Sequence, residues 1–242
     1  MADGGVCLAY VHSNRVSYSW HQSTMHAVLY DAGRDGHMMR GGYLAMRYGT
    51  DGLVAARNQT AEMFLKRPAE WLWWVDTDMG FEPDALYRLL EAADPVERPV
   101  VGGLCFVWRE TETDGMGGFR HDAVPTIFDW QPKHGFVPRR EYERDAVVQC
   151  AGTGCAMILV HRSVLERLGP DPYVRRRNPD SGKLIGEDLS FCTRLAEHGI
   201  QLHVHTGVKT SHHKELWVTE RDFDGPTSGP DWLPPNVRVV AA

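Results

Sequence analysis

The chain has 242 residues, of which 43% are hydrophobic and 24% charged, and its formal net charge is −6. This composition is ordinary for a soluble globular protein, and the length suits one domain with a single core. The negative charge argues against broad, non-specific nucleic-acid binding, which depends on neutralising phosphates. The sequence has no apolar run of about 18 residues, so no transmembrane helix is predicted.

The cysteines and the N-terminus bear on the cellular compartment. The five cysteines are an odd number and are scattered through mostly apolar segments. This pattern is typical of small core residues in a reducing compartment rather than of a disulfide framework. The N-terminus has neither a basic region nor a long apolar stretch, so we expect no signal peptide. We therefore expect a cytoplasmic protein.

The first half of the chain alternates apolar runs with segments of helical periodicity, which indicates an open α/β sheet. We predict strands at residues 6–11, 42–48, 71–75 and 99–107, helices at 17–30, 52–66 and 83–93, and a glycine-rich loop at 31–40.

The second half is less regular. Residues 108–144 have mixed composition and no long periodic segment, so we predict an irregular excursion with one short strand at 123–128. An irregular stretch of this size in a compact domain is more often functional than accidental. After it we predict a glycine-bearing turn and strand within 147–160, a helix at 163–169 started by a capping box at Ser163, a basic flexible loop at 175–181, a helix at 189–198 and a strand at 200–206.

Two carboxylates stand directly after the predicted strand at 71–75. Burying Asp76 beside a hydrophobic strand is costly, and Asp78 adds like-charge repulsion. A bound cation is the simplest explanation for such a pair. Gly80 and Pro83 then lead into a helix, so the acids lie after a strand's carboxyl end, where open α/β sheets bind ligands. The alternative is that they are ordinary turn or cap residues.

Three further residues are candidates for the same edge of the sheet. Arg57 and Asn58 lie in the first turns of a predicted helix. A cation there opposes the helix dipole, so Arg57 is unfavourable unless an anion is near, and a diphosphate would serve. An ion pair with Asp51 or Glu62 is the alternative. His12 follows the first strand and could contact a nucleotide, although a plain turn explains it equally well.

The predicted helix at 189–198 is preceded by Glu187 and Asp188, and each acid alone is explained as a normal helix cap. Beyond the last predicted strand, His212 and His213 lie in a predicted loop, and only one of them can easily point into a shared site.

Two other late histidines, His203 and His205, face the same side of the last predicted strand and are most simply ordinary strand residues. A zinc hydrolase built on the four late histidines lacks any helix of the His-Glu-x-x-His type and ranks last among the hypotheses.

The ordered combination of the Asp76–Asp78 pair, the Glu187–Asp188 pair and a late histidine resembles the GT-A glycosyltransferases. The likeness is greatest to the family 2-like members of bacteria and phages, and it extends over most of the chain. It implies an α/β, Rossmann-like GT-A fold with a central, mostly parallel sheet flanked by helices. It also implies a single domain over residues 1–242, with a nucleotide-sugar-binding half at about 1–107 and an acceptor-binding half at about 108–242. The segments similar to family elements are residues 16–20, 56–59 and 152–160.

The resemblance implies a role for each candidate residue. Asp78 would coordinate a divalent cation together with His212, with His213 as the alternative ligand, and Asp76 would contact the metal or the ribose. Oxygen ligands with one imidazole suit Mn²⁺ or Mg²⁺. Asp188, with Glu187 beside it, corresponds to the catalytic base of inverting members. The residues expected to bind the nucleotide are His12, Arg57, Asn58 and Asp76.

The function implied is metal-dependent transfer of a hexose or pentose from a nucleotide-diphosphate sugar to an acceptor hydroxyl. A retaining route stays open if Asp188 only orients the acceptor. The acceptor stays open between a glycan, a protein, a small metabolite and a hydroxylated base in phage-type DNA, as do the nucleotide and the oligomeric state. One alternative is a nucleotidyltransferase, although the loop after the first strand offers a triphosphate only Arg15. Another is a non-catalytic protein that binds carbohydrate or nucleotide on the same fold. No membrane insertion is expected.

Overall fold

The computed structural model describes residues 4–112 and 119–213, without the side chains of 108–112 and 119–122. The described residues fall into a large compact unit, 4–106 with 125–213, and a small unit that includes 107–112 and 119–124. The predicted division of one domain into two halves near residue 107 stays a prediction.

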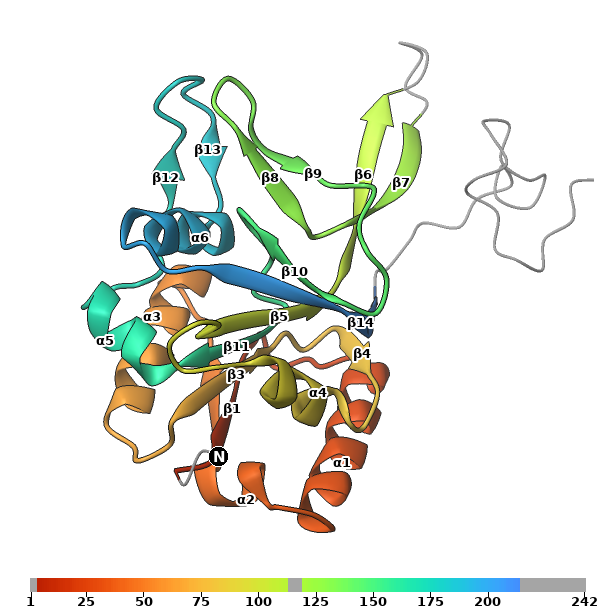
Figure 1. Ribbon diagram of the computed structural model, residues 1–242, viewed down its shortest axis with the longest axis vertical. Coiled ribbons are helices and arrows are strands. Elements are labelled where there is room, and N and C mark those ends of the chain that lie inside the picture. Colours follow the sequence, from red (N-terminus) through yellow and green to blue (C-terminus); the bar gives the residue numbers. More distant parts are fainter. Residues whose placement is uncertain (1–3, 113–118, 214–242) are drawn as a thin grey trace, which may run out of the picture. The chain divides into compact units, whose positions relative to one another are not determined.

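An eight-stranded sheet forms the centre of the large unit, with neighbours in the order β10-β14-β5-β11-β3-β1-β2 and with β4 paired to β14 (Figure 1). Strands β1, β2, β3, β5 and β14 run in one direction, whereas β4, β10 and β11 run against them. The predicted α/β class with a mostly parallel sheet is confirmed. The strands are β1 Val6–His12, β2 Tyr43–Arg47, β3 Trp71–Val75, β4 Met79–Phe81, β5 Val100–Leu104, β10 Val147–Cys150, β11 Met157–His161 and β14 Leu202–His212.

The central strands are buried on both faces. Every residue of β3 and of β5 is buried, as expected for a continuous apolar run that has helices on each side. Alternate side chains of β3 point to opposite faces. Leu72 and Trp74 therefore pack in one core cluster, and Trp71 and Trp73 pack in the other.

Among the described residues, six helices cover the sheet. Helices α3, α5 and α6 contribute to the cluster around Trp74, while α1, α2 and α4 contribute to the cluster around Trp73, so each set covers one face (Figure 1). The helices are α1 Tyr18–Ala32, α2 His37–Gly41, α3 Gly52–Leu65, α4 Ala85–Ala92, α5 Arg162–Leu168 and α6 Glu187–Glu197.

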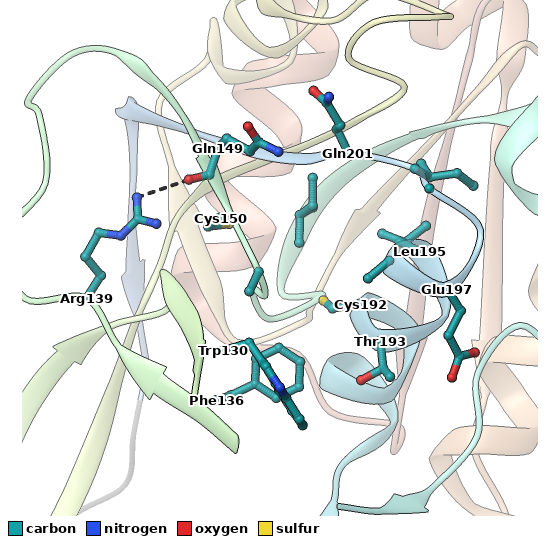
Figure 2. A pocket seen from close by; sticks show the side chains of 15 residues that line it. Trp130, Phe136, Arg139, Gln149, Cys150, Cys192, Thr193, Leu195, Glu197 and Gln201 are labelled. Atoms are coloured by element: carbon teal, nitrogen blue, oxygen red, sulfur yellow. Dashed lines mark hydrogen bonds between the residues drawn. The ribbon is translucent and has the colours of Figure 1, made fainter. Parts of the chain in front are cut away.

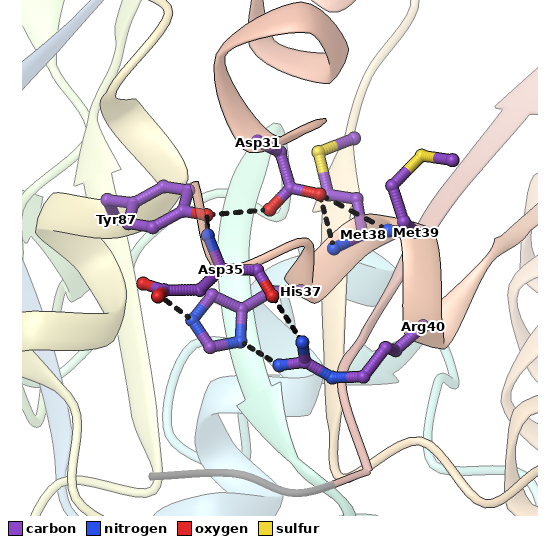
Figure 3. A network of polar contacts seen from close by, with 7 residues as sticks. All are labelled: Asp31, Asp35, His37, Met38, Met39, Arg40 and Tyr87. Carbon is purple, nitrogen blue, oxygen red and sulfur yellow. Dashed lines mark hydrogen bonds and ion pairs between the residues drawn. The ribbon is translucent and has the colours of Figure 1, made fainter. Parts of the chain in front are cut away.

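The prediction of a loop at residues 31–40 was wrong, because α2 begins within it, at His37. The buried carboxylate of Asp31 accepts hydrogen bonds from the backbone N–H groups of Met38 at 2.9 Å and Met39 at 3.2 Å (Figure 3). These donors have no partner within the helix, so Asp31 caps α2 from the end of α1. The hydroxyl of Tyr87 also donates to Asp31, at 2.9 Å. A cap contributed from outside the helix leaves no local sequence signal.

The irregular excursion predicted at 108–144 was also wrong, because it contains two hairpins. Strand β6 (Phe106–Glu112) pairs with β7 (Phe119–Pro125), and β8 (Phe128–Gln131) pairs with β9 (Gly135–Pro138). The strand predicted at 123–128 is divided between β7 and β8. Short two-stranded hairpins are held by backbone pairing, and their sequences carry little periodicity.

Two smaller predictions were corrected. The basic loop at 175–181 includes β12 (Arg176–Arg177), which pairs with β13 (Leu184–Ile185). Helix α5 begins at Arg162 and is capped by the ring of His161, which accepts from the N–H of Ser163, so the predicted capping box at Ser163 does not form.

The five cysteines are buried and free, which confirms their prediction as core residues. Within the described ranges, no helix combines the length and apolar character needed to cross a bilayer.

Candidate active site

The two predicted acids lie at the carboxyl edge of the sheet, in the turn between β3 and β4. The N–H of Asp76 donates to the carbonyl of Ala156 at 2.8 Å, and the N–H of Met79 donates to the carbonyl of Asp76 at 3.2 Å. These bonds fix the turn directly after the buried strand. Strand β4 was not predicted, and it sends the chain back across the end of the sheet toward β14.

Asp78 meets His212 because β4 and β14 are paired. Their antiparallel register sets His212 opposite Met79, next to Asp78. The Oδ2 atom of Asp78 lies 3.0 Å from Nε2 of His212. The side chain of His213 is exposed, and its backbone N–H donates to the carbonyl of Asp78 at 2.8 Å. The predicted loop position of His212 was wrong: it is the last residue of β14, which pairing with β4 extends.

Both ring nitrogens of His212 face oxygen acceptors. The Nδ1 atom is 2.9 Å from the carbonyl oxygen of Phe106, and Nε2 faces Asp78. A neutral imidazole carries only one N–H, so the second contact needs either an additional proton or a cation between Nε2 and the carboxylate. Two ligands on adjacent octahedral positions, each about 2.1 Å from an ion, are separated by about 3.0 Å. A separation of 3.0 Å is compatible with shared ligation of Mn²⁺ or Mg²⁺ and also with a direct hydrogen bond, so Asp78 and His212 could hold such an ion together.

Asp76 is directed toward Arg57. The Nη2 atom of Arg57 lies 3.0 Å from Oδ1 of Asp76. In the part of the chain that the structure describes, no three His, Cys, Asp or Glu side chains converge in the way that a metal site would require. The structure thus brings together two members of the predicted metal set, Asp78 and His212. Divalent cations of this kind are often held by one or two carboxylates together with the substrate's phosphates.

Arg57 is buried, with only 3% of its side chain exposed. Its guanidinium lies over the rings of Trp74 at 5.2 Å and Tyr173 at 5.8 Å. Its Nε is 3.9 Å from a carboxylate oxygen of Glu187. The carboxylate that offsets the charge of Arg57 is therefore that of Asp76, at the end of β3. The ion pair with Asp51 or Glu62, the alternative hypothesis from the sequence, does not form in the described part of the chain.

Several carboxylates surround this one guanidinium. Burial raises the pKa of Asp76 above the ordinary range, Arg57 opposes that rise, and the neighbouring charge of Asp78 adds to it. Asp76 still has 31% of its side chain exposed, so a ligand can reach it. With Glu187 and Asp188 also near Arg57, negative charge exceeds positive charge in this cluster. Such an excess favours binding of a cation.

Helix α6 carries Glu187 and Asp188 in its first turn. The Oδ1 atom of Asp188 accepts from the N–H of Leu189 at 2.7 Å. Burial raises the pKa of Asp188, the N–H of Leu189 lowers it, and the charge of Glu187 raises it further, with a net rise. A half-buried carboxylate with increased proton affinity is suited to act as a general base.

Two predicted nucleotide ligands make other contacts. The Nδ1 atom of His12, at the end of β1, accepts from the N–H of Asn14 at 3.2 Å. The side chain of Asn58 donates to the carbonyl of Tyr173 at 2.8 Å and accepts from its N–H at 2.9 Å. Neither residue joins the cluster around Arg57, and their roles as nucleotide ligands stay predictions.

Tyr173, which the Asn58 contacts hold in place, was not predicted as a site residue. Its ring lies beneath the guanidinium of Arg57 and stacks on Phe191 with centroids 4.8 Å apart. Tyr173 follows α5 in a segment without periodicity, so no sequence signal indicated it. It connects the helix that carries Arg57 with the helix that carries Asp188.

Comparison with known proteins identifies the fold. No protein-family model and no curated protein matches the sequence. Among solved structures, A197 from STIV is similar with a TM-score of 0.54 and 13% identity, over 87% of this chain and 86% of that one. GalNAc-T7, crystallised with UDP, GalNAc and Mn²⁺, is similar with a TM-score of 0.57 and 12% identity, over 88% of this chain. The matched region spans 43% of the GalNAc-T7 chain.

The chain therefore has a GT-A type of α/β fold, as the motifs predicted. At these identities the likeness establishes the fold alone.

Proposed function

We propose that this protein is a metal-dependent glycosyltransferase, which moves a sugar from a nucleotide-diphosphate sugar to an acceptor hydroxyl. The observation that carries the proposal is the contact of 3.0 Å between Asp78 and His212, two ligand types for Mn²⁺ or Mg²⁺ at the carboxyl edge of a GT-A sheet. The similarity to GalNAc-T7, whose crystals held UDP, GalNAc and Mn²⁺, supports the same chemistry.

Asp78 and His212 would hold the ion, which when bound offsets negative charge as it develops on a leaving diphosphate. Asp76 would contact the ion or the donor ribose, because its second oxygen and its exposed fraction leave it accessible while Arg57 fixes its position. Arg57 would act mainly by positioning Asp76, since its side chain is buried beneath that carboxylate.

Asp188 would accept the proton of the acceptor hydroxyl as that oxygen attacks the anomeric carbon. The bond between the sugar and the diphosphate breaks in the same step. A general base is most effective when its pKa lies close to the working pH. Burial moves the pKa of Asp188 in that direction. Attack assisted by one base gives inversion at the anomeric carbon.

A nucleotide-sugar panel tests the proposal. Thermal unfolding with each donor, in Mn²⁺ and in EDTA, should reveal at least one donor that stabilises the protein only with the metal. The same donor should be hydrolysed slowly to free sugar and nucleoside diphosphate. Stabilisation without turnover would indicate a binding protein, and release of pyrophosphate from a nucleoside triphosphate would indicate a nucleotidyltransferase. A panel with neither metal-dependent binding nor turnover would overturn the proposal.

A further inference from the structure

A pocket with a volume of about 740 Å³ lies between the β8–β9 hairpin and the C-terminal half of α6 (Figure 2). Its volume is within the range of roughly 300–1,000 Å³ that is usual for small-molecule sites. Thr193 and Glu197, which line it, follow Asp188 by five and nine residues, or roughly 8 and 14 Å along the helix axis. The lining does not include Asp76, Asp78, Glu187 or Asp188, so the pocket lies beside the candidate active site rather than in it.

Two aromatic residues of the hairpin form one wall of the pocket. Trp130 has 37% of its surface exposed, and the ring of Phe136 meets it edge-to-face with centroids 5.0 Å apart (Figure 2). Phe136 is held against the backbone of Gly152, where a Cβ would come within 2.6 Å of the ring. The backbone N–H groups of Phe128 and Gly152 each donate to the carbonyl of the other residue, at 2.9 and 3.1 Å, and fix the base of the hairpin. These contacts hold in place the hairpin that carries the exposed indole of Trp130.

The floor and the rim of the pocket differ in polarity. The floor consists of buried apolar side chains, and the rim carries amide, hydroxyl and charged groups. The floor residues are Cys150, Cys192, Leu195, Ile200 and Leu202, and the rim residues are Arg139, Gln149, Thr193, Glu197 and Gln201.

The charges on the rim are already paired. The guanidinium of Arg139 forms an ion pair with Asp129 and also donates to the carbonyl of Gln149 at 3.1 Å. Glu197 is paired with Arg176 at 2.6 Å. A charged ligand would have to compete with these partners, whereas an uncharged ligand that forms many hydrogen bonds would not.

We propose that this pocket binds a neutral oligosaccharide, with one sugar ring lying on the exposed indole of Trp130. A pyranose ring has an apolar C–H face that can cover an aromatic surface and hydroxyl groups around its edge. Those hydroxyls can exchange hydrogen bonds with the amides of Gln149 and Gln201 and with the hydroxyl of Thr193. A purely aliphatic ligand would fit the floor but would desolvate these rim groups without replacing their hydrogen bonds.

The site goes beyond the proposed transferase activity, since it requires neither the metal nor the nucleotide. Binding is therefore tested in EDTA and without donor, by titration calorimetry and ligand-observed NMR. The probes are neutral hexasaccharides of glucose, mannose, galactose, xylose and N-acetylglucosamine, with a hexauronate and decanoate as charged and aliphatic comparisons. At least one neutral hexasaccharide should bind at millimolar concentration or below.

Trp130→Ala should weaken that binding at least tenfold, and Thr193→Arg should block it by filling the pocket from the opposite wall. Tyr43→Ala removes an exposed aromatic residue on β2, 63% exposed, and should leave binding unchanged. Thermal unfolding verifies that each variant is folded. The proposal is overturned if no neutral hexasaccharide binds, if only the hexauronate or decanoate binds, or if folded Trp130→Ala and Thr193→Arg both bind like the wild type.

Discussion

Asp78 and His212 are 134 residues apart in the chain, and a carboxylate oxygen of one lies 3.0 Å from a ring nitrogen of the other. The contact depends on a three-residue strand, β4, which pairs with the end of β14. It joins the turn after β3 to the last described strand at the carboxyl edge of the sheet.

Replacing His212 should weaken metal binding. His212→Ala removes the imidazole next to Asp78. We expect the affinity for Mn²⁺ to fall by at least about tenfold, because losing a residue that merely hydrogen-bonds to a metal ligand already costs about 10- to 100-fold. Titration calorimetry with MnCl₂ measures the effect. His213→Ala is the matched control, because that side chain is exposed and adjacent. Equal losses in both variants would contradict the assignment.

Replacing Asp188 should reduce turnover strongly and leave donor binding intact. We expect kcat of Asp188→Asn to fall by about 10²–10⁴, the usual contribution of a general base. In the wild type, activity should fall with decreasing pH as Asp188 is protonated. Because burial raises the pKa of Asp188, this acid limb should lie above the ordinary aspartate range. A kcat/KM profile shows it, and loss of donor binding in the variant would instead put Asp188 in the donor site.

The same substitution should increase stability at neutral pH. A carboxyl whose pKa is higher in the folded than in the unfolded state binds its proton more tightly when folded, so stability decreases as pH rises through that interval. Asp188→Asn lacks this cost. The gain in free energy of unfolding over the wild type, measured in urea, should be absent below the ordinary aspartate pKa of about 3.9. It should reach its full size above the raised pKa of Asp188. Asp180→Asn, at an exposed position outside the cluster around Arg57, is the comparison variant.

The Arg57–Asp76 pair should be important for stability as well as position. Arg57→Met removes the buried cation beside a carboxylate, and we expect a loss of roughly 3 kcal/mol in the free energy of unfolding. Adding Asp76→Asn to Arg57→Met should recover part of this loss, because it removes the carboxylate charge that the first substitution leaves without its partner. A double-mutant cycle by chemical denaturation measures the coupling. Additive single effects would show that the two side chains act independently.

Asp31 should be required for the second helix. Asp31→Ala removes the acceptor for two N–H groups of α2, and a lost cap typically costs about 1–2 kcal/mol. Asp35→Ala is the control, since its carboxylate is 63% exposed and lies 3.8 Å from the ring of His37. Hydrogen exchange at Met38 and Met39 should accelerate in the first variant only. Unchanged protection in Asp31→Ala would contradict the capping role.

Local sequence patterns were sufficient for most helices and for the central strands. The apolar run that forms β3 is buried on both faces, and the helical periodicity after Gly52 gives α3 within one residue of its predicted end. Such patterns succeed because burial on a sheet or on one side of a helix repeats over short distances along the chain. They failed for α2 and the short hairpins, which are stabilised by a remote cap or by backbone pairing.

The sequence by itself determined that two acids follow a buried strand, that two more begin a helix, and that a late histidine follows. Only the tertiary structure decided their partners: Asp78 with His212 rather than His213, and Arg57 with Asp76 rather than Asp51 or Glu62. The reason is physical. Local periodicity fixes an element, whereas a contact between side chains depends on the register in which distant elements pair.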